Sequence, residues 1–291
     1  MARIIIDRRS LTNRVDGGSL RVLQTYYFSE VNVMNIIEMN QVTWYREGKA
    51  VLNGIDWTVR EGEHWAMLGL NGSGKTTLLN MISGYLWPTS GEISVLGNRF
   101  GEVDLRELRK TIGWVSSSMQ SKLHGEQKAE DLVVSGKFAS IGLYEKPHTE
   151  DYDRAAALMH QLRCSHLRGR TYQTCSQGEQ QKLLIARALM ASPKLLILDE
   201  ATNGLDFISR EGLLESIAQL AAEPNTPHML YVTHHTEEIL PIFSRTLLLR
   251  RGEVYSQGKT DEVLNETGLS DFFETPVALR WSQERAWLST K

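Results

Sequence analysis

The order of apolar and polar positions divides the chain into segments with a strand period or a helix period. Residues 36–59 alternate in strand fashion, with a turn signal at Asn53-Gly54. A continuous apolar run follows at residues 65–68, and residues 78–82 have the spacing of a buried helix face. We therefore expect an antiparallel β layer, then a buried strand that leads directly into a helix.

The second half of the chain repeats the sequence of strand, loop and helix. Because apolar strands that are separated by helices favour a mostly parallel sheet, the pattern predicts an α/β core. The last two expected strands, joined through Arg251-Gly252, are typical of a hairpin. Strands are expected at 92–96, 112–115, 195–198, 229–232, 246–250 and 253–256, and helices at 105–110, 181–190 and 209–222.

Residues 120–178 differ in character from the flanking segments. Residues 130–138 and 151–162 have helical spacing, and the region shows no strand signal. We therefore predict an all-helical lobe, inserted at about 120–178 into the α/β core.

Both ends of the chain look unlike the middle. Residues 1–33 carry scattered arginines without a sustained period, which predicts a disordered or non-native extension. Residues 34–265 form the expected domain. Residues 266–291 form a C-terminal tail with a loose helical pattern that the sequence does not place.

The charge, the cysteines and the apolar runs of the chain argue against some classes of function. The chain has 291 residues and a net charge of −3, so nothing indicates a nucleic-acid-binding surface. Its two cysteines, Cys164 and Cys175, have no metal-binding or redox spacing, which favours a reducing compartment. No apolar run approaches the roughly 20 residues needed to cross a bilayer. Any membrane role is therefore expected to come through a partner.

The strongest chemical signal is the glycine-rich stretch between the apolar run at 65–68 and the helix at 78–82. Its glycines allow backbone N–H groups to surround a phosphate, and the helix N-terminus adds unpaired donors. Lys75 can reach the β- and γ-phosphates, and Thr76 can offer its hydroxyl to Mg²⁺. An ordinary glycine turn is the alternative, which the flanking strand and helix disfavour. The expected ATP contacts are Gly69, Leu70, Asn71, Gly72, Ser73, Gly74, Lys75, Thr76 and Thr77.

Acidic and imidazole side chains follow two later apolar strands. Asp199 and Glu200 end one strand, and His234 ends the next. Because ligands bind at the carboxyl edge of parallel strands, Asp199 is expected to hold Mg²⁺ and Glu200 to polarise the attacking water. Two acids at a strand end are more often a solvated terminus, but a phosphate loop in the same sheet reverses that judgement. His234 can orient the water and the γ-phosphate, whereas His235 is expected to point to the opposite side.

Taken together, these motifs resemble an ABC-type ATPase. The resemblance rests on the glycine-rich loop G-L-N-G-S-G-K-T-T, the strand L-L-I-L-D-E and V-T-H at 232–234. C-S-Q-G-E at 175–179 is similar to the signature motif of that family, and N-G-L-D follows at 203–206. The match covers about residues 36–260 in the order and spacing of the family.

The resemblance implies two subunits that face head to tail, with each ATP between the phosphate loop of one chain and the signature turn of the other. The turn (Ser176, Gln177, Gly178 and Glu179) would then face the ATP of the partner chain. Residues Asn203, Gly204, Leu205 and Asp206 would lie at the subunit contact. Tyr45 would stack on adenine, although its residue pattern alone favours a buried or edge tyrosine.

Two positions depart from the family pattern. Cys175 and Gln177 replace the leucine and the first of two glycines that are common in the signature. The family also places a glutamine, which contacts Mg²⁺, after the strand expected at 112–115. Ser117 matches that position and Gln120 follows three residues later, so either could serve.

The resemblance implies an ATP- and Mg²⁺-dependent ATPase subunit of a membrane transporter. It would lie in the cytoplasm on the inner face of the membrane and dock a separate permease through the helical lobe. The alternative is a soluble ATPase of the same family that acts in translation or nucleic-acid maintenance. Such relatives often carry two fused units or a long coiled coil, and this chain shows neither an internal repeat nor heptads. A P-loop kinase or GTPase would not account for the signature-like turn and His234.

Overall fold

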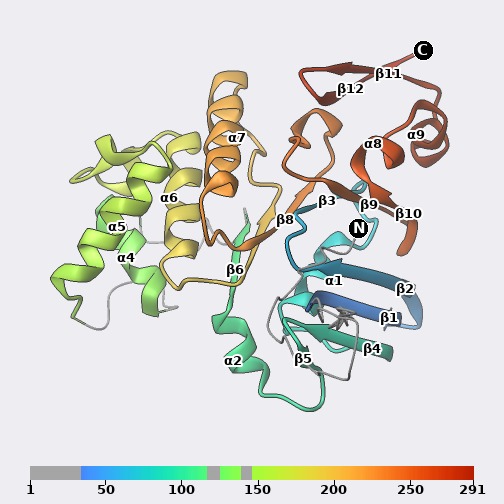
Figure 1. The fold of residues 1–291 in the computed structure, drawn as a ribbon, viewed down its shortest axis with the longest axis horizontal. Helices are drawn as coiled ribbons and strands as arrows, with labels where there is room; N and C mark the ends of the chain where they lie inside the picture. Colours follow the sequence, from blue (N-terminus) through green and yellow to red (C-terminus); the bar gives the residue numbers. More distant parts are fainter. Residues whose placement is uncertain (1–33, 117–124, 139–145) are drawn as a thin grey trace, which may run out of the picture.

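A computed structural model describes residues 34–116, 125–138 and 146–291 of the protein. The extension predicted at residues 1–33, and Ser117 and Gln120, lie outside the described residues. Two larger sheets, a two-stranded sheet near the C-terminus and a group of helices make up the described part of the chain (Figure 1).

The larger sheet has six strands in the order β10-β9-β3-β8-β7-β6. Neighbouring strands from β9 to β6 are parallel, and β10 pairs antiparallel with β9, as the predicted hairpin requires. The central strands are almost entirely buried, which explains their continuous apolar runs. The strands are β3 (Trp65–Leu68), β6 (Ile112–Ser116), β7 (Leu195–Asp199), β8 (His228–Thr233), β9 (Arg245–Arg250) and β10 (Glu253–Lys259).

The smaller sheet is the predicted antiparallel layer, in the order β2-β1-β4-β5. Its apolar face packs with the first helix, α1 (Lys75–Ile82), and with one face of the larger sheet in a shared core. In that core Trp57 and Trp65 meet edge to face, with ring centroids 5.6 Å apart. The strands are β1 (Asn35–Arg46), β2 (Lys49–Arg60), β4 (Ser90–Val95) and β5 (Asn98–Arg99).

The predicted helical lobe is present in the described part of 120–178. Apart from one isolated bridge between Lys128 and Thr171, residues 125–138 and 146–174 contain no strand. The helices α4 (Ala129–Ser135) and α5 (Thr149–Gln161) lie beside α6 (Gln177–Leu189) (Figure 1). Short 3₁₀ turns complete the lobe: η1 (Gly136–Phe138), η2 (Ser165–Leu167) and η3 (Tyr172–Thr174).

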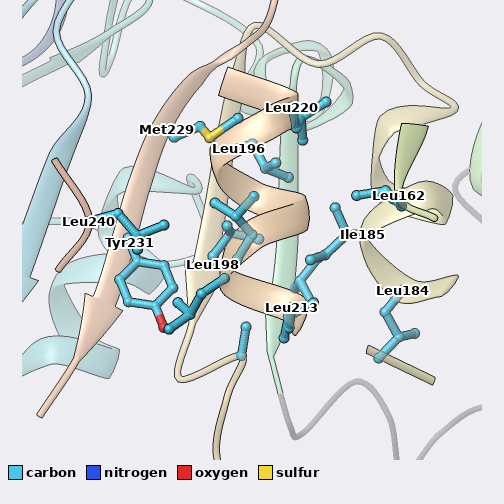
Figure 2. Close-up of a cluster of buried hydrophobic side chains, with 14 of the residues drawn as sticks. Leu162, Leu184, Ile185, Leu196, Leu198, Leu213, Leu220, Met229, Tyr231 and Leu240 are labelled. Atoms are coloured by element: carbon cyan, nitrogen blue, oxygen red, sulfur yellow. The ribbon is translucent and has the colours of Figure 1, made fainter. Parts of the chain in front are cut away.

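Helix α7 (Phe207–Ala222) joins the lobe to the larger sheet. Figure 2 shows Leu213 of α7 in one apolar cluster with Leu198 of β7 and Ile185 of α6. The lobe and the strand that carries Asp199 therefore share one close-packed core. The short helix α2 (Leu105–Lys110) lies where the sequence predicts it.

The C-terminal segment is more ordered in structure than its sequence suggests. The loose helical pattern is correct for α9 (Glu266–Phe273), which follows α8 (Thr260–Val263). A β-hairpin that the sequence did not predict comes next, made of β11 (Val277–Ser282) and β12 (Arg285–Thr290). Phe272, Val277 and Ala286 are buried in the same core as α6 and α7.

Candidate active site

The glycine-rich loop runs from the end of β3 into the first turn of α1. Gly74 caps the helix with a φ of +105°, and a Cβ at this position would lie 2.9 Å from Leu52 Cδ2 and 3.1 Å from Val51 O. Both the backbone conformation and the close approach of β2 therefore require glycine. Asn71, Gly72 and Thr76 are exposed on the outer side of the loop, where a ligand could reach them.

The Lys75 side chain turns back over this loop. Its Nζ donates to Gly69 O at 2.7 Å and to Leu70 O at 3.3 Å, and it is 3.4 Å from Glu200 Oε1. The residue is only 6% exposed, so its charge is held at the loop and not in solvent. Beside it, the buried Ser73 Oγ has no hydrogen-bond partner among the described residues. A cation and an unsatisfied hydroxyl at the same loop suit an anionic ligand.

The parallel register brings the acidic pair to the loop. Asp199 of β7 pairs with Val232 of β8, and the next residue of β8, Thr233, pairs with Leu68 of β3. Burial, and secondly the neighbouring Glu200 carboxylate, raise the pKa of Asp199 to about 6, although Lys75 opposes this shift. A carboxylate whose charge is so poorly compensated would be stabilised by a bound cation.

Glu200 occupies a special backbone position. Its φ is +50°, in the left-handed region that non-glycine residues rarely adopt. Its N–H donates to Val232 O at 2.9 Å and its carbonyl accepts from Asn203 N at 3.1 Å, so hydrogen bonds on both sides hold this conformation. Unfavourable backbone geometry that neighbours over-determine is typical of functional positions.

The Glu200 side chain collects three partners. Oε1 is 3.4 Å from Lys75 Nζ and 3.6 Å from His234 Nδ1, and Oε2 accepts a hydrogen bond from Asn203 Nδ2 at 2.9 Å. The structure therefore brings together the predicted loop lysine, acid and histidine. The sequence analysis assigned Asn203 only to a subunit contact and did not predict this hydrogen bond. The bond depends on the left-handed backbone at Glu200, which the sequence pattern does not indicate.

One expectation about the histidines is wrong. His235 does not point away from His234: the two ring centroids are 4.1 Å apart. The alternation of a strand no longer applies, because β8 ends at Thr233. His235 Nδ1 lies 3.5 Å from Glu237 Oε1.

The signature-like turn caps α6. Ser176 Oγ accepts from Glu179 N at 3.3 Å, and Ser176 N donates to Glu179 Oε2 at 2.7 Å, which forms a capping box. This cap starts α6 at Gln177, four residues before the predicted helix. A Cβ on Gly178 would lie 2.9 Å from Ser209 Cβ, so glycine allows the first turns of α6 and α7 to touch. Gln177 is exposed, whereas Cys175 is buried.

The remaining predicted residues lie at the surface. Asp206 caps α7 by accepting hydrogen bonds from Ser209 N at 3.0 Å and Ser209 Oγ at 2.7 Å. Asn203 and Gly204 are exposed and Leu205 is partly buried. Tyr45, at the end of β1, is 49% exposed, so one ring face is accessible for stacking.

The donor set fits Mg²⁺ that is bound together with a triphosphate. Among the described residues, no group of three or more His, Cys, Asp or Glu could hold a metal. Mg²⁺ in phosphoryl-transfer sites needs fewer protein ligands, because phosphate oxygens and water supply the rest. Asp199 and the exposed Thr76 hydroxyl would contribute from the strand and from α1.

The comparison with known families agrees with the geometry. The ABC transporter family profile matches residues 52–203, about half of the chain. A relative in Bacillus subtilis, the ABC transporter ATP-binding protein YlmA, is 50% identical over 87% of this chain and 97% of its own length. The chain belongs to the ABC transporter family. Two relatives are both described as an ABC transporter ATP-binding protein, which identifies the chain as an ATP-binding component of that family.

Solved structures support the ABC fold. CbiO1 from Clostridium perfringens, part of the ABC transporter complex cbiONQ, is 26% identical with a TM-score of 0.71 over 81% of this chain and 93% of its own. The ATP-binding cassette MJ0796, a dimer bound to ADP and phosphate, is 25% identical with a TM-score of 0.64. That comparison covers 77% of this chain and 98% of MJ0796. No helix in the described part of this ABC protein is long and apolar enough to cross a membrane.

Proposed function

We propose that this ABC protein is the ATP-hydrolysing, nucleotide-binding subunit of a membrane transporter, and that ATP drives the closure of its dimer. The observation that carries the proposal is the convergence on Glu200 Oε1 of Lys75 Nζ at 3.4 Å and His234 Nδ1 at 3.6 Å. These side chains come from three segments that meet at one edge of the sheet. ATP hydrolysis requires a triphosphate cradle, a metal and a group that orients the attacking water, and Glu200 with His234 could serve as that group.

Each side chain then has a defined task. Lys75 would exchange the carbonyls of Gly69 and Leu70 for β- and γ-phosphate oxygens. Glu200 would accept a proton from the attacking water, and His234 would hold that water and the γ-phosphate in line. Mg²⁺, held by Asp199 and Thr76, would neutralise the developing phosphate charge. Tyr45 would stack on adenine.

Two copies complete the proposed site. The signature turn begins α6, among the helices of the lobe, whereas the phosphate loop begins α1 below β3 (Figure 1). Because the two turns lie in different parts of one chain, Ser176 and Gly178 would face the ATP that is bound by the partner copy. The loop Asn203–Asp206 would lie at that contact. MJ0796, a relative of similar fold, forms a dimer with ADP and phosphate.

The permease is proposed as a separate membrane protein. The relatives carry the name ABC transporter ATP-binding protein, and CbiO1 is part of a transporter complex. The helical lobe would dock the permease, and the subunit would work on the cytoplasmic face of the membrane. Recovery of the tagged chain with one integral membrane protein supports this assignment. Recovery with ribosomes or DNA in a salt-sensitive manner would instead support a soluble role.

The test of hydrolysis is Glu200→Gln, which keeps the shape of the side chain and removes its basicity. We expect unchanged ATP binding, turnover slower by about two to three orders of magnitude, and an ATP-dependent dimer in size-exclusion chromatography. Glu107→Gln, which changes an exposed side chain of α2, is the matched control and should behave like the parent. Normal hydrolysis by Glu200→Gln would show that Glu200 is not the base.

A further inference from the structure

The C-terminal hairpin reaches the turn that follows His234. Arg285 is the first residue of β12, and its side chain is only 12% exposed. Its Nε donates to the carbonyl of Glu237, in the 3₁₀ turn η4 (Thr236–Glu238). The hairpin therefore holds this turn through the backbone, at a point three residues after His234.

The same guanidinium also binds α7. Nη1 is 2.5 Å from Glu211 Oε2 and Nη2 is 3.1 Å from Glu211 Oε1, a bidentate pair with two parallel hydrogen bonds. Such a fork fixes orientation as well as distance. Because Arg285 uses all three of its nitrogens, it clamps η4 against the first turns of α7.

The inner side of the His234 turn is fixed separately. Thr233 Oγ1 donates to the buried Glu238 carboxylate at 2.6 Å and accepts from His235 N at 3.0 Å. These contacts tie the turn to the end of β8. Arg285 joins the outer side of the His234 turn to α7. In α7, Ser209 packs against Gly178 of the signature turn. Arg285 thus links the segment carrying His234 to the helix that supports the signature, alongside Arg210 of α7, whose Nη1 lies 3.8 Å from Glu237 Oε1.

We propose that Arg285 is a positioning residue for ATP hydrolysis, which holds the His234 turn in register with α7. The inference rests on the proposed function, because it assumes that His234 acts in hydrolysis. Arg285 contacts none of the expected ATP-binding residues. Its loss should therefore slow the chemical step and leave the binding of ATP by the phosphate loop intact.

The test compares Arg285→Ala with Arg163→Ala. Arg163 also pairs with a glutamate of α7, Glu215, at 2.8 Å, but both partners are about half exposed and lie away from η4. Each variant therefore removes one positive charge and one ion pair to α7, but only Arg285→Ala removes a bidentate pair that also holds η4. We expect kcat to fall about tenfold in Arg285→Ala, with KM for ATP and equilibrium ATP binding within about twofold. Arg163→Ala should retain the parent values.

Conservative variants separate positioning from folding. Arg285→Lys keeps the positive charge and one donor nitrogen, so its kcat should lie between those of Arg285→Ala and the parent. Glu211→Ala should reproduce the defect, and the double variant Glu211→Ala/Arg285→Ala should be little worse than either single variant, because the two residues act as one unit. If Arg285→Ala does not yield folded protein, Arg285→Lys and Glu211→Ala are judged by the same criteria.

Each outcome decides the proposal. A kcat within about twofold of the parent in Arg285→Ala and Glu211→Ala overturns it, as does an equal loss in Arg163→Ala. A loss of ATP binding in step with kcat would also overturn it. If His234→Ala hydrolyses ATP normally, the proposed function itself fails at this residue. If His234→Ala is impaired while Arg285→Ala is normal, only the present inference fails.

Discussion

At the residue scale, the site depends on side chains that the structure holds in unusual states. Glu200 has a left-handed backbone, Asp199 a pKa raised mainly by burial, and Lys75 a buried ammonium group. Each state is costly for an isolated residue. Glu200 already lies 3.4 Å from Lys75 Nζ, and a bound nucleotide with its metal would add phosphate partners for Lys75 and a positive charge beside Asp199.

Asn203 offers a test of how tightly Glu200 must be held. Asn203→Ala removes the 2.9 Å hydrogen bond to Glu200 Oε2, which frees the carboxylate to rotate. We expect kcat to fall about three- to tenfold with little change in ATP affinity, because the interaction orients the base and not the substrate. Asn203→Asp should be worse, since it sets a like charge against Glu200. Steady-state ATPase assays, beside nucleotide-binding titrations, measure both effects. Equal kcat values for all three proteins would contradict a role for this contact.

At the element scale, the sequence predicted the elements with strong periodicity and missed those that depend on special backbone geometry. The buried strands and the helices α2 and α7 lie within two residues of their expected ends. The β11–β12 hairpin was missed because its turn residues, Gln283 and Glu284, take φ values of +50° and +58° without the Asn or Gly that usually marks such a turn.

The candidate site, like the elements, has a part that the sequence pattern predicts and a part that depends on special backbone geometry or distant contacts. That the glycine-rich loop, Asp199, Glu200 and His234 lie close together could be predicted, because strand ends in a parallel sheet share an edge. The Asn203 hydrogen bond and the Arg285 clamp could not, since they depend on a left-handed residue and on a pairing across 74 positions of sequence. His235 was misplaced because the strand period was extended two residues beyond the end of β8 at Thr233.

Strand β8 contains a pH-sensitive contact of its own. Met229 N donates to His64 Nδ1 at 3.0 Å, so the imidazole must be neutral to accept. Burial, and secondly the charge of His228, lower the pKa of His64 below 6.5. As the pH falls through 6.5, the unfolded chain therefore binds more protons at His64 than the folded chain does. The contribution of His64 to the free energy of unfolding is lost towards acid pH and is restored as the pH rises.

We expect the melting temperature of the parent to gain on that of His64→Asn between pH 5.5 and 7.5, because the opposing effect of Asp199, whose pKa is raised to about 6, is common to both proteins. Asparagine can place its Oδ1 near the position of Nδ1 and keeps an acceptor for Met229 N without titrating in this range. Differential scanning calorimetry of both proteins across the pH series measures the two slopes. Identical slopes would show that His64 does not contribute to the pH dependence. His160→Asn, at the exposed end of α5, is a control for loss of a histidine.

At the scale of the whole molecule, the larger sheet, the lobe and the C-terminal hairpin all converge on α7. Its first turn contacts Gly178, its cap is Asp206, and its outer face binds Arg285. The helix therefore connects the acidic strand, the signature turn and the His234 turn within one chain. In a head-to-tail dimer, these groups would belong to two different ATP sites. Movement of α7 is consequently a route by which one site could influence the other.

The dimer arrangement predicts a separation between ATP binding and dimer closure. In the Glu200→Gln background, Ser176→Arg places a long cation at the first turn of α6, where the γ-phosphate of the partner's ATP would sit. We expect each monomer to bind ATP within about twofold of the parent affinity and no ATP-dependent dimer to form.

Ser165→Arg, an exposed site on the same lobe, is the matched control and should still dimerise. Binding is measured by equilibrium titration, and dimer formation by light scattering with ATP and Mg²⁺. A normal dimer in Ser176→Arg would remove the turn from the interface, whereas loss of ATP binding by the monomer would place Ser176 in the site of its own chain.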